Sequence, residues 1–349
     1  MQQDKLQGAS HANLRASRRR AVSVTQEELV KMQPIQPGET LPLLAVPAAD
    51  KLDLMEWARN NTEIVAQRLL QHGAILFRNF DLSTVGEFEQ FIAAVSGNAL
   101  EYRERSSPRS QVSGNIYTST DHPADQTIFL HNEHSYATTI PLKIFFFCVM
   151  PAEQGGATPI GDMRKLFQII PPKIRERFRE RQYMYVRNFG DGFGLSWQTA
   201  FQTTDKNAVE QYCQRHKISY EWKDGDRLRT CQVRPAVIRH PQTGEEIWFN
   251  HLTFFHVFTL PAHIREALLT NFAEKDLPNN TYYGDGSPIE ESVLAELQAA
   301  HRHVTAAFPW QRGDLLMLDN VLTSHGREPF VGTRKIVVGM SEPFTRSDF

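Results

Sequence analysis

Residues 129–136, FLHNEHSY, place three side chains that can bind a metal ion inside an apolar and aromatic run. Imidazole nitrogens and carboxylate oxygens are common ligands of transition metals in proteins. If residues 126–133 form a strand, His131 and Glu133 project to the same face, because side chains alternate along a strand. His134 then projects to the opposite face, where we expect a structural role. The segment therefore predicts one pair of metal ligands, His131 and Glu133.

Two ligands alone do not define a metal site, since a histidine and a carboxylate often form only a hydrogen bond. The best candidate for a third ligand is His325. It lies in a polar loop between two predicted buried strands, LLML at 315–318 and KIVVGM at 335–340, where the mouth of a barrel would lie. Two histidines and one carboxylate favour non-haem Fe(II) with open coordination positions. Zinc in a hydrolase can use the same ligands, so the set alone leaves both metals open.

The elements that must position these residues follow from the spacing of the apolar side chains. Gly73 is expected to end the first helix, and Ser83 is a candidate N-cap of the second. Short β-rich pieces then alternate with Pro and Gly turns. The predicted helices cover 52–73, 83–97, 261–275 and 289–308, and the predicted strands include 74–80 and several pieces between 125 and 162.

Strand patterns on both sides of residues 163–245 predict one mainly β domain with helices around it, whose core is a β-sandwich or jelly roll. Residues 163–245 mix helical segments with loops rich in Gly and Asp, and are predicted to be a helical and loop insertion into the β core. The domain is expected to span 25–349. Residues 1–24 are polar and locally basic, which predicts a mobile arm or a surface strap.

Composition argues against several classes of protein. The 349 residues are 41% hydrophobic and 22% charged, with a formal net charge of -2, so nucleic acid is a poor candidate partner. The three cysteines, Cys148, Cys213 and Cys231, show no C-x-x-C spacing, which favours a reducing, cytoplasmic location. The most apolar run, residues 143–150, is too short to span a bilayer. We expect a soluble protein without membrane contact.

Five motifs occur in an order and spacing that resemble those of the Fe(II)/2-oxoglutarate dioxygenases of the taurine dioxygenase and clavaminate synthase superfamily. The resemblance spans roughly residues 70–345, and it is most similar to the syringomycin-type branch. Members of that branch hydroxylate amino acids, often tethered to carrier proteins, during natural-product assembly. The motifs are HNE at 131–133, GGATPIGD at 155–162, HPQTGEEIWFN at 240–250, FPWQRGDLLMLDN at 308–320 and HGREPFVGTRK at 325–335.

The resemblance implies a double-stranded β-helix fold with His131, Glu133 and His325 as the iron ligands. It implies 2-oxoglutarate and O2 as co-substrates, and a reaction that hydroxylates an unactivated C–H bond and releases succinate and CO2. Glu133 stands where Asp is commoner in the superfamily, but it keeps the carboxylate. That carboxylate argues against a halogenase, because related halogenases carry Gly or Ala at this position. A desaturase or an epoxidase on the same scaffold is the main alternative.

The resemblance also implies the residues that bind the distal carboxylate of 2-oxoglutarate. Thr158 matches the threonine of the family's Gly-Gly-x-Thr element, and a hydroxyl donor suits a carboxylate. Arg334 at the final strand matches the arginine, whose planar guanidinium fits a carboxylate. The neighbouring Lys335 would take this place if the strand were shifted by one residue.

Two features of the sequence are candidates for substrate contacts. A basic cluster, Arg103, Arg105 and Arg109, precedes the metal-binding segment and could bind a substrate carboxylate or a carrier's phosphate, although a solvated basic surface is the simpler explanation. Asn250, at the end of a predicted strand, is a tentative substrate contact. The expected partner is a free amino acid or a carrier-bound aminoacyl group. A metal-dependent hydrolase and a non-catalytic jelly-roll binding module also remain, although neither explains Thr158 together with Arg334.

Overall fold

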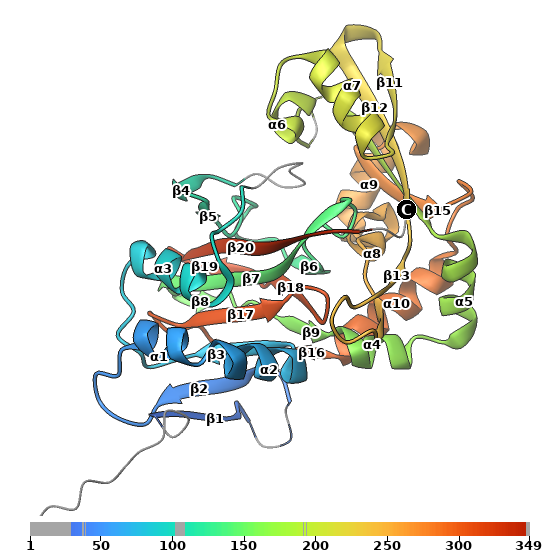
Figure 1. Cartoon of the computed structure of the whole chain (residues 1–349). Helices are drawn as coiled ribbons and strands as arrows, with labels where there is room; N and C mark the ends of the chain where they lie inside the picture. Colours follow the sequence, from blue (N-terminus) through green and yellow to red (C-terminus); the bar gives the residue numbers. More distant parts are fainter. Residues whose placement is uncertain are drawn as a thin grey trace, which may run out of the picture.

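The structure is a computed structural model of the chain, shown in Figure 1. The predicted arm at 1–24 lies outside the described residues, as do Arg103 and Arg105 of the basic cluster. The described residues are 29–36, 38, 40–101, 109–190, 192 and 194–346.

An eight-stranded sheet forms one wall of the core. Its longest strands, β7 (Thr139–Met150) and β20 (Lys335–Thr345), pair antiparallel along their lengths. In spatial order the remaining strands are β1 (Val30–Pro34), β2 (Leu43–Pro47), β3 (Ala74–Phe77) and β17 (Leu315–Asp319) on the β7 side, and β5 (Ile116–Thr118) and β4 (Gln111–Ser113) on the β20 side.

A smaller four-stranded sheet, in the order β16-β9-β18-β6, carries the predicted metal ligands. Strands β8 and β19 form a separate two-stranded antiparallel sheet; along the chain, β8 precedes β9 and β19 follows β18. The smaller four-stranded sheet is antiparallel, and the larger one is antiparallel apart from the parallel pair β2–β3, which confirms the predicted jelly-roll class of fold. The strands are β16 (Thr305–Ala306), β9 (Ile160–Asp162), β18 (Thr323–Arg327), β6 (Ile128–His131), β8 (Gln154–Gly155) and β19 (Phe330–Val331).

Strand β7 shows why the central strands are apolar throughout. Phe145 and Phe147 pack beneath the N-terminal helices, whereas Phe146 and Cys148 face the opposite side, where Ile160 of β9 joins the same cluster. Both faces of the strand are therefore buried, so an uninterrupted apolar run is expected rather than alternation. Each fully buried phenylalanine stabilises the fold by about 1.5–3 kcal/mol.

Three helices cover the outer face of the large sheet (Figure 1): α1 (Leu54–Asn60), α2 (Thr62–His72) and α3 (Val85–Ser96). Gly73 ends α2 with a φ of 77°, as the sequence predicted. The predicted N-cap of α3 was wrong, because Thr84 and not Ser83 caps this helix. Thr84 accepts a hydrogen bond from Glu87 N, and the Glu87 carboxylate accepts one from Thr84 N, which satisfies two free helix-end donors at once.

The predicted insertion at 163–245 contains more β structure than we expected. It supplies three strands of a second four-stranded sheet, in the order β11-β12-β10-β15, that projects with α6 and α7 from the core (Figure 1). The fourth strand, β15, lies outside the predicted insertion. The helices and strands of the insertion are α4 (Met163–Ile169), α5 (Pro172–Arg181), β10 (Tyr183–Phe189), α6 (Trp197–Phe201), α7 (Lys206–Arg215), β11 (Ser219–Lys223), β12 (Arg227–Arg234) and β13 (Val237–Arg239). Strands β14 (Glu246–Trp248), which pairs with β13, and β15 (Asn279–Tyr283) follow the insertion.

Two C-terminal helices, α9 (Ala262–Asn271) and α10 (Glu291–His303), agree with the prediction in place but are shorter. The short helix α8 (Leu252–Phe255) was not predicted. The helix α9 has no buried residue, so it lies on the core rather than within it. Among the described residues, no helix has the length and apolar character needed to cross a membrane.

Candidate metal centre

The three predicted ligands converge in the structure. His131 of β6 and His325 of β18 are direct partners across the antiparallel ladder, and their ring centroids are 4.5 Å apart. With Glu133 they offer ligand atoms that all lie within 4.8 Å of one another. Two imidazoles and a carboxylate at this separation fit a single non-haem metal ion.

A turn, rather than strand parity, places Glu133. Strand β6 ends at His131, and the chain then turns, with a positive φ of 56° at His134. The predicted orientation of His134 away from the site was wrong for this reason: its Nε2 lies 3.8 Å from Glu133 Oε1. Burial lowers the pKa of His134 to about 4, so the ring is neutral near pH 7.

Asn320 holds this turn, and sequence reasoning assigned it no role. Its side-chain Oδ1 accepts a hydrogen bond from Glu133 N at 2.8 Å, and its Nδ2 donates to Glu133 O at 2.9 Å and to Pro141 O at 2.9 Å. Asn132 Nδ2 donates in return to Asn320 O at 2.6 Å. Asn320 directly follows β17, so the large sheet fixes the backbone of the ligand Glu133.

The environment of His131 prepares it to bind a metal. Its Nδ1 lies 2.9 Å from Phe129 O and can only donate to that carbonyl, which leaves Nε2 with a free lone pair. Burial and the neighbouring His325 lower the pKa of His131 to about 3, so the ring is neutral. Phe254 lies against the ring with centroids 4.6 Å apart and restricts its rotation.

Arg109 forms an ion pair with the carboxylate ligand. Its Nη2 donates to Glu133 Oε2 at 2.7 Å, and both side chains are buried. Burial alone would raise the pKa of Glu133, but Arg109, together with the nearby histidines, holds that pKa well below its usual range. Glu133 is therefore an anion, which is the form that binds a metal.

The predicted 2-oxoglutarate residues lie together on the wall of a cavity that His131 and His325 also line. Arg334 Nη2 donates to Thr158 Oγ1 at 3.3 Å, and Trp310 Nε1 donates to the same oxygen at 3.0 Å. Both lone pairs of the Thr158 hydroxyl are thus used, so its proton is free to be donated to another acceptor. Trp310 was part of a recognised motif, but sequence reasoning gave it no function.

Arg334 has the surroundings of an anion-binding group. Its three hydrogen bonds go to neutral oxygens, on Gly156, Ser119 and Thr158. Burial and the neighbouring Arg327 lower its pKa to about 10, so it remains a cation at neutral pH. Lys335 is exposed at the start of β20 and does not line the cavity. The structure thus brings Arg334, and not Lys335, to Thr158.

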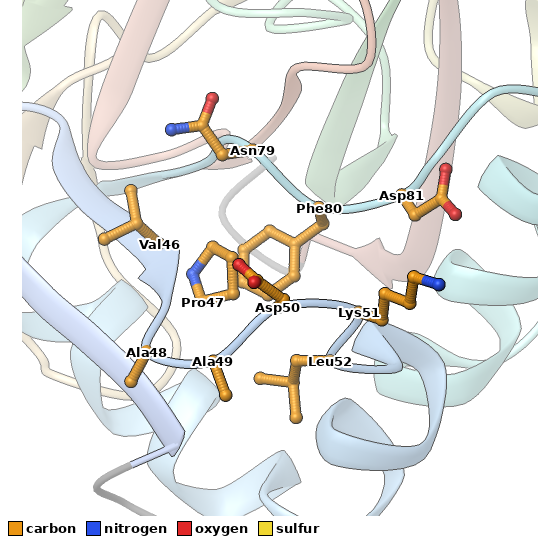
Figure 2. A pocket seen from close by; sticks show the side chains of 10 residues that line it. All are labelled: Val46, Pro47, Ala48, Ala49, Asp50, Lys51, Leu52, Asn79, Phe80 and Asp81. Carbon is orange, nitrogen blue, oxygen red and sulfur yellow. The ribbon is translucent and has the colours of Figure 1, made fainter.

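A cavity of about 1050 Å³ joins these groups. His131, His325, Thr158, Arg334 and Arg109 line it. Asn250 is not among its lining residues; its side chain donates to Ala236 O at 3.0 Å and accepts from Leu252 N at 3.1 Å. A separate hollow of about 770 Å³ lies between the end of β2 and Asn79–Asp81, and none of the proposed metal ligands lines it. Figure 2 shows the side chains that line this hollow.

The sequence model of the family described as "Taurine catabolism dioxygenase TauD, TfdA family" matches residues 34–340. The chain therefore belongs to this family, and it is an Fe(II)- and 2-oxoglutarate-dependent dioxygenase. Its fold and its buried His-Glu-His ligand set agree with that assignment.

Individual relatives support the same family. The chain is 41% identical over 275 residues to the dapdiamide synthesis protein DdaC of Enterobacter agglomerans. The aligned residues cover 79% of this chain and 84% of that protein. A clavaminate synthase-like protein of Arabidopsis thaliana is 28% identical over 284 residues, covering 78% and 82% of the two chains. The crystal structure of PvcB from Pseudomonas aeruginosa shares the fold, with a TM-score of 0.54 at 16% identity over 91% of this chain and 93% of that one.

Proposed function

We propose that this dioxygenase hydroxylates an unactivated C–H bond of an amino acid or a carrier-tethered aminoacyl group in natural-product biosynthesis. The observation that carries the proposal is that His131 and His325, with Glu133 beside them, line the same cavity as the Thr158–Arg334 pair, where co-substrate and substrate can lie side by side. The similarity to a dapdiamide synthesis protein supports the biosynthetic role. The resemblance to the syringomycin-type branch supports the substrate class.

The roles of the residues follow from their positions. His131, Glu133 and His325 would hold the iron, which together with 2-oxoglutarate and O2 supplies the oxidising power for C–H cleavage. The guanidinium of Arg334 and the free hydroxyl proton of Thr158 would bind the distal carboxylate of 2-oxoglutarate. The remaining cavity wall then decides which carbon faces the iron.

The size and lining of the cavity favour an elongated substrate. Pockets for drug-sized ligands commonly enclose about 300–1,000 Å³, and the volume of this cavity lies just above that range. It extends from the metal-binding residues to α9, whose Ile264 and Leu268 line it one helical turn apart. An aminoacyl group on a longer chain would fill this apolar part, whereas a free amino acid would leave most of it to water.

The test of the proposed substrate is a panel of free and carrier-loaded amino acids, assayed for substrate-dependent succinate release. The proposal expects release to rise with an aminoacyl substrate, and the product to gain one oxygen atom. A product that gains oxygen across an existing double bond, or that loses two hydrogens, would instead assign the epoxidase or desaturase alternative. If no member of the panel stimulates succinate release, the proposed substrate class is wrong. The cytoplasmic location stays a prediction from the sequence.

A further inference from the structure

Arg109 contacts one of the proposed metal ligands, Glu133, directly. Its Nη2 contacts Glu133 Oε2 at 2.7 Å, with side-chain exposures of 5% for the arginine and 3% for the glutamate. A bond between a guanidinium and a carboxylate is among the stronger hydrogen bonds in proteins, and burial strengthens it further. Arg109 is therefore bonded directly to the carboxylate that the metal needs.

The other groups around Glu133 cannot replace this contact. Oε1 faces His134 Nε2 at 3.8 Å, and Oε2 faces His325 Nε2 at 3.6 Å, both beyond ordinary hydrogen-bond length. Arg109 is thus the permanent cation in contact with Glu133 among the residues that the structure describes.

We propose that Arg109 is a positioning residue that fixes the Glu133 carboxylate so that it offers one oxygen to the metal. The inference rests on the assignment of Glu133 as a metal ligand. A carboxylate can bind a metal through one or two oxygens, and in a site with two histidines and one carboxylate the open positions serve the co-substrates. A guanidinium bonded to one carboxylate oxygen opposes rotation of the group and keeps those positions open.

This role differs from the tentative substrate contact that the sequence suggested for Arg109. Arg109 does line the cavity, so a substrate carboxylate could in principle reach it. The two roles make different predictions, because a positioning residue acts on metal binding when substrate and 2-oxoglutarate are both absent. A substrate-binding residue acts only when substrate is present.

The experiment measures Mn(II) and Co(II) affinity of the full-length apo-protein by calorimetry, without 2-oxoglutarate or substrate. The variants are Arg109→Gln, which keeps a donor without the charge, and Arg109→Lys, which keeps the charge without the planar fork. Loss of a group that orients a metal ligand typically costs about 10–100-fold in affinity. We expect Arg109→Gln to fall in that range and Arg109→Lys to recover part of the loss.

Two further variants separate the possible outcomes. Glu133→Ala should remove nearly all affinity, and if it does not, the assignment of the metal ligand fails and the inference falls with it. Arg78→Gln is the matched control, because Arg78 forms a similar pair with Asp314 at 2.6 Å outside the cavity. It should lower thermal stability and leave metal affinity unchanged.

The inference is overturned if Arg109→Gln and Arg109→Lys both bind metal at least as tightly as the parent, while Glu133→Ala has lost its metal affinity. Unchanged metal affinity with a raised KM for substrate would assign Arg109 to substrate binding instead. If Arg109→Gln does not fold, Arg109→Lys decides by the same criteria, since it keeps the charge that compensates Glu133.

Discussion

At the scale of single residues, the site depends on the charge state of its buried side chains. Glu133 is an anion because Arg109 contacts it, and His131 is neutral because burial opposes its protonation. Arg334 differs, since its hydrogen bonds to described residues all go to neutral oxygens, which leaves its charge available for a ligand. A cation in this state is suited to bind a dicarboxylate co-substrate.

Arg334→Ala should therefore raise the KM for 2-oxoglutarate. Loss of hydrogen bonds to a charged group costs about 1.5–3 kcal/mol, which corresponds to a rise of roughly ten- to 150-fold. Steady-state kinetics at saturating iron measure this effect. Lys335→Ala is the neighbouring control, because Lys335 is exposed and should have little influence. The opposite result, with only the lysine variant impaired, would show that the wrong residue has been assigned.

Sequence and structure agree best on those residues whose chemistry is local. His131, Glu133, His325, Thr158 and Arg334 stand in recognisable motifs. The structure brings the two histidines, Thr158 and Arg334 to the wall of one cavity and places Glu133 beside the histidines. The supporting contacts could not be predicted in the same way, because they join distant parts of the chain. One signal was present: Asn320 and Trp310 both lie in the motif at 308–320, although nothing in the sequence shows which backbone or hydroxyl they contact.

At the scale of elements, the site forms where strands β6 and β18 of the smaller sheet lie close to the end of β17 in the large sheet. His131 and His325 come together because β6 and β18 pair, and Asn320 ties the turn after β6 to the end of β17. The large sheet therefore supports a ligand that it does not itself carry. Rigid strands with a pinned turn hold ligands more accurately than a free loop would.

Asn320→Ala should weaken both the fold and the metal site. Leaving the Glu133 backbone groups without their buried partners costs about 1–3 kcal/mol in the free energy of unfolding. Urea unfolding measures that loss, and Mn(II) calorimetry measures the accompanying drop in metal affinity. Asn61→Ala is the comparison, since the Asn61 side chain donates to Trp57 O between α1 and α2. Its stability should fall while metal affinity stays at the parent value; equal metal affinity in both variants would refute the role of Asn320.

Periodicity predicted the helices near both ends of the chain and the strands of the core, since these elements bury one or both faces. It failed for the sheet β11-β12-β10-β15. In β12, buried positions alternate with half-buried ones, but the buried positions are occupied by Leu228, Thr230, Gln232 and Arg234. Only one of these is apolar, so the alternation of burial leaves no alternation of hydrophobicity in the sequence. Tertiary contacts, such as Arg234 Nε donating to Tyr136 O, make those polar side chains acceptable inside.

At the scale of the whole molecule, burial keeps several histidines neutral. His301 on α10 is buried with its Nδ1 2.8 Å from Leu297 O, and its pKa is lowered from 6.5 to about 4. His303, two residues further along the same helix, is exposed. The pair gives an internal comparison of how a buried and an exposed imidazole affect the acid stability of the fold.

Stability should fall on acidification through His301. The unfolded chain binds a proton at this residue as the pH drops below its ordinary pKa of 6.5, whereas the folded protein resists protonation down to about pH 4. Folding stability is therefore retained above pH 6.5 and lost progressively between pH 6.5 and 4, by up to a few kcal/mol at about 1.4 kcal/mol per pKa unit. Urea unfolding at pH 7.5 and pH 5 should show a smaller acid loss in His301→Gln than in the parent, and no such difference in His303→Gln. Identical acid losses in all three proteins would contradict this account.

The most direct test of the central claim is an anaerobic titration of the apo-protein with Fe(II), followed by 2-oxoglutarate. We predict that a weak visible charge-transfer band appears only after 2-oxoglutarate is added, that it is absent in Glu133→Ala, and that it needs more 2-oxoglutarate in Arg334→Ala. Binding of iron without any such band, or retention of zinc alone, would contradict the claim that these residues form a 2-oxoglutarate-dependent iron site.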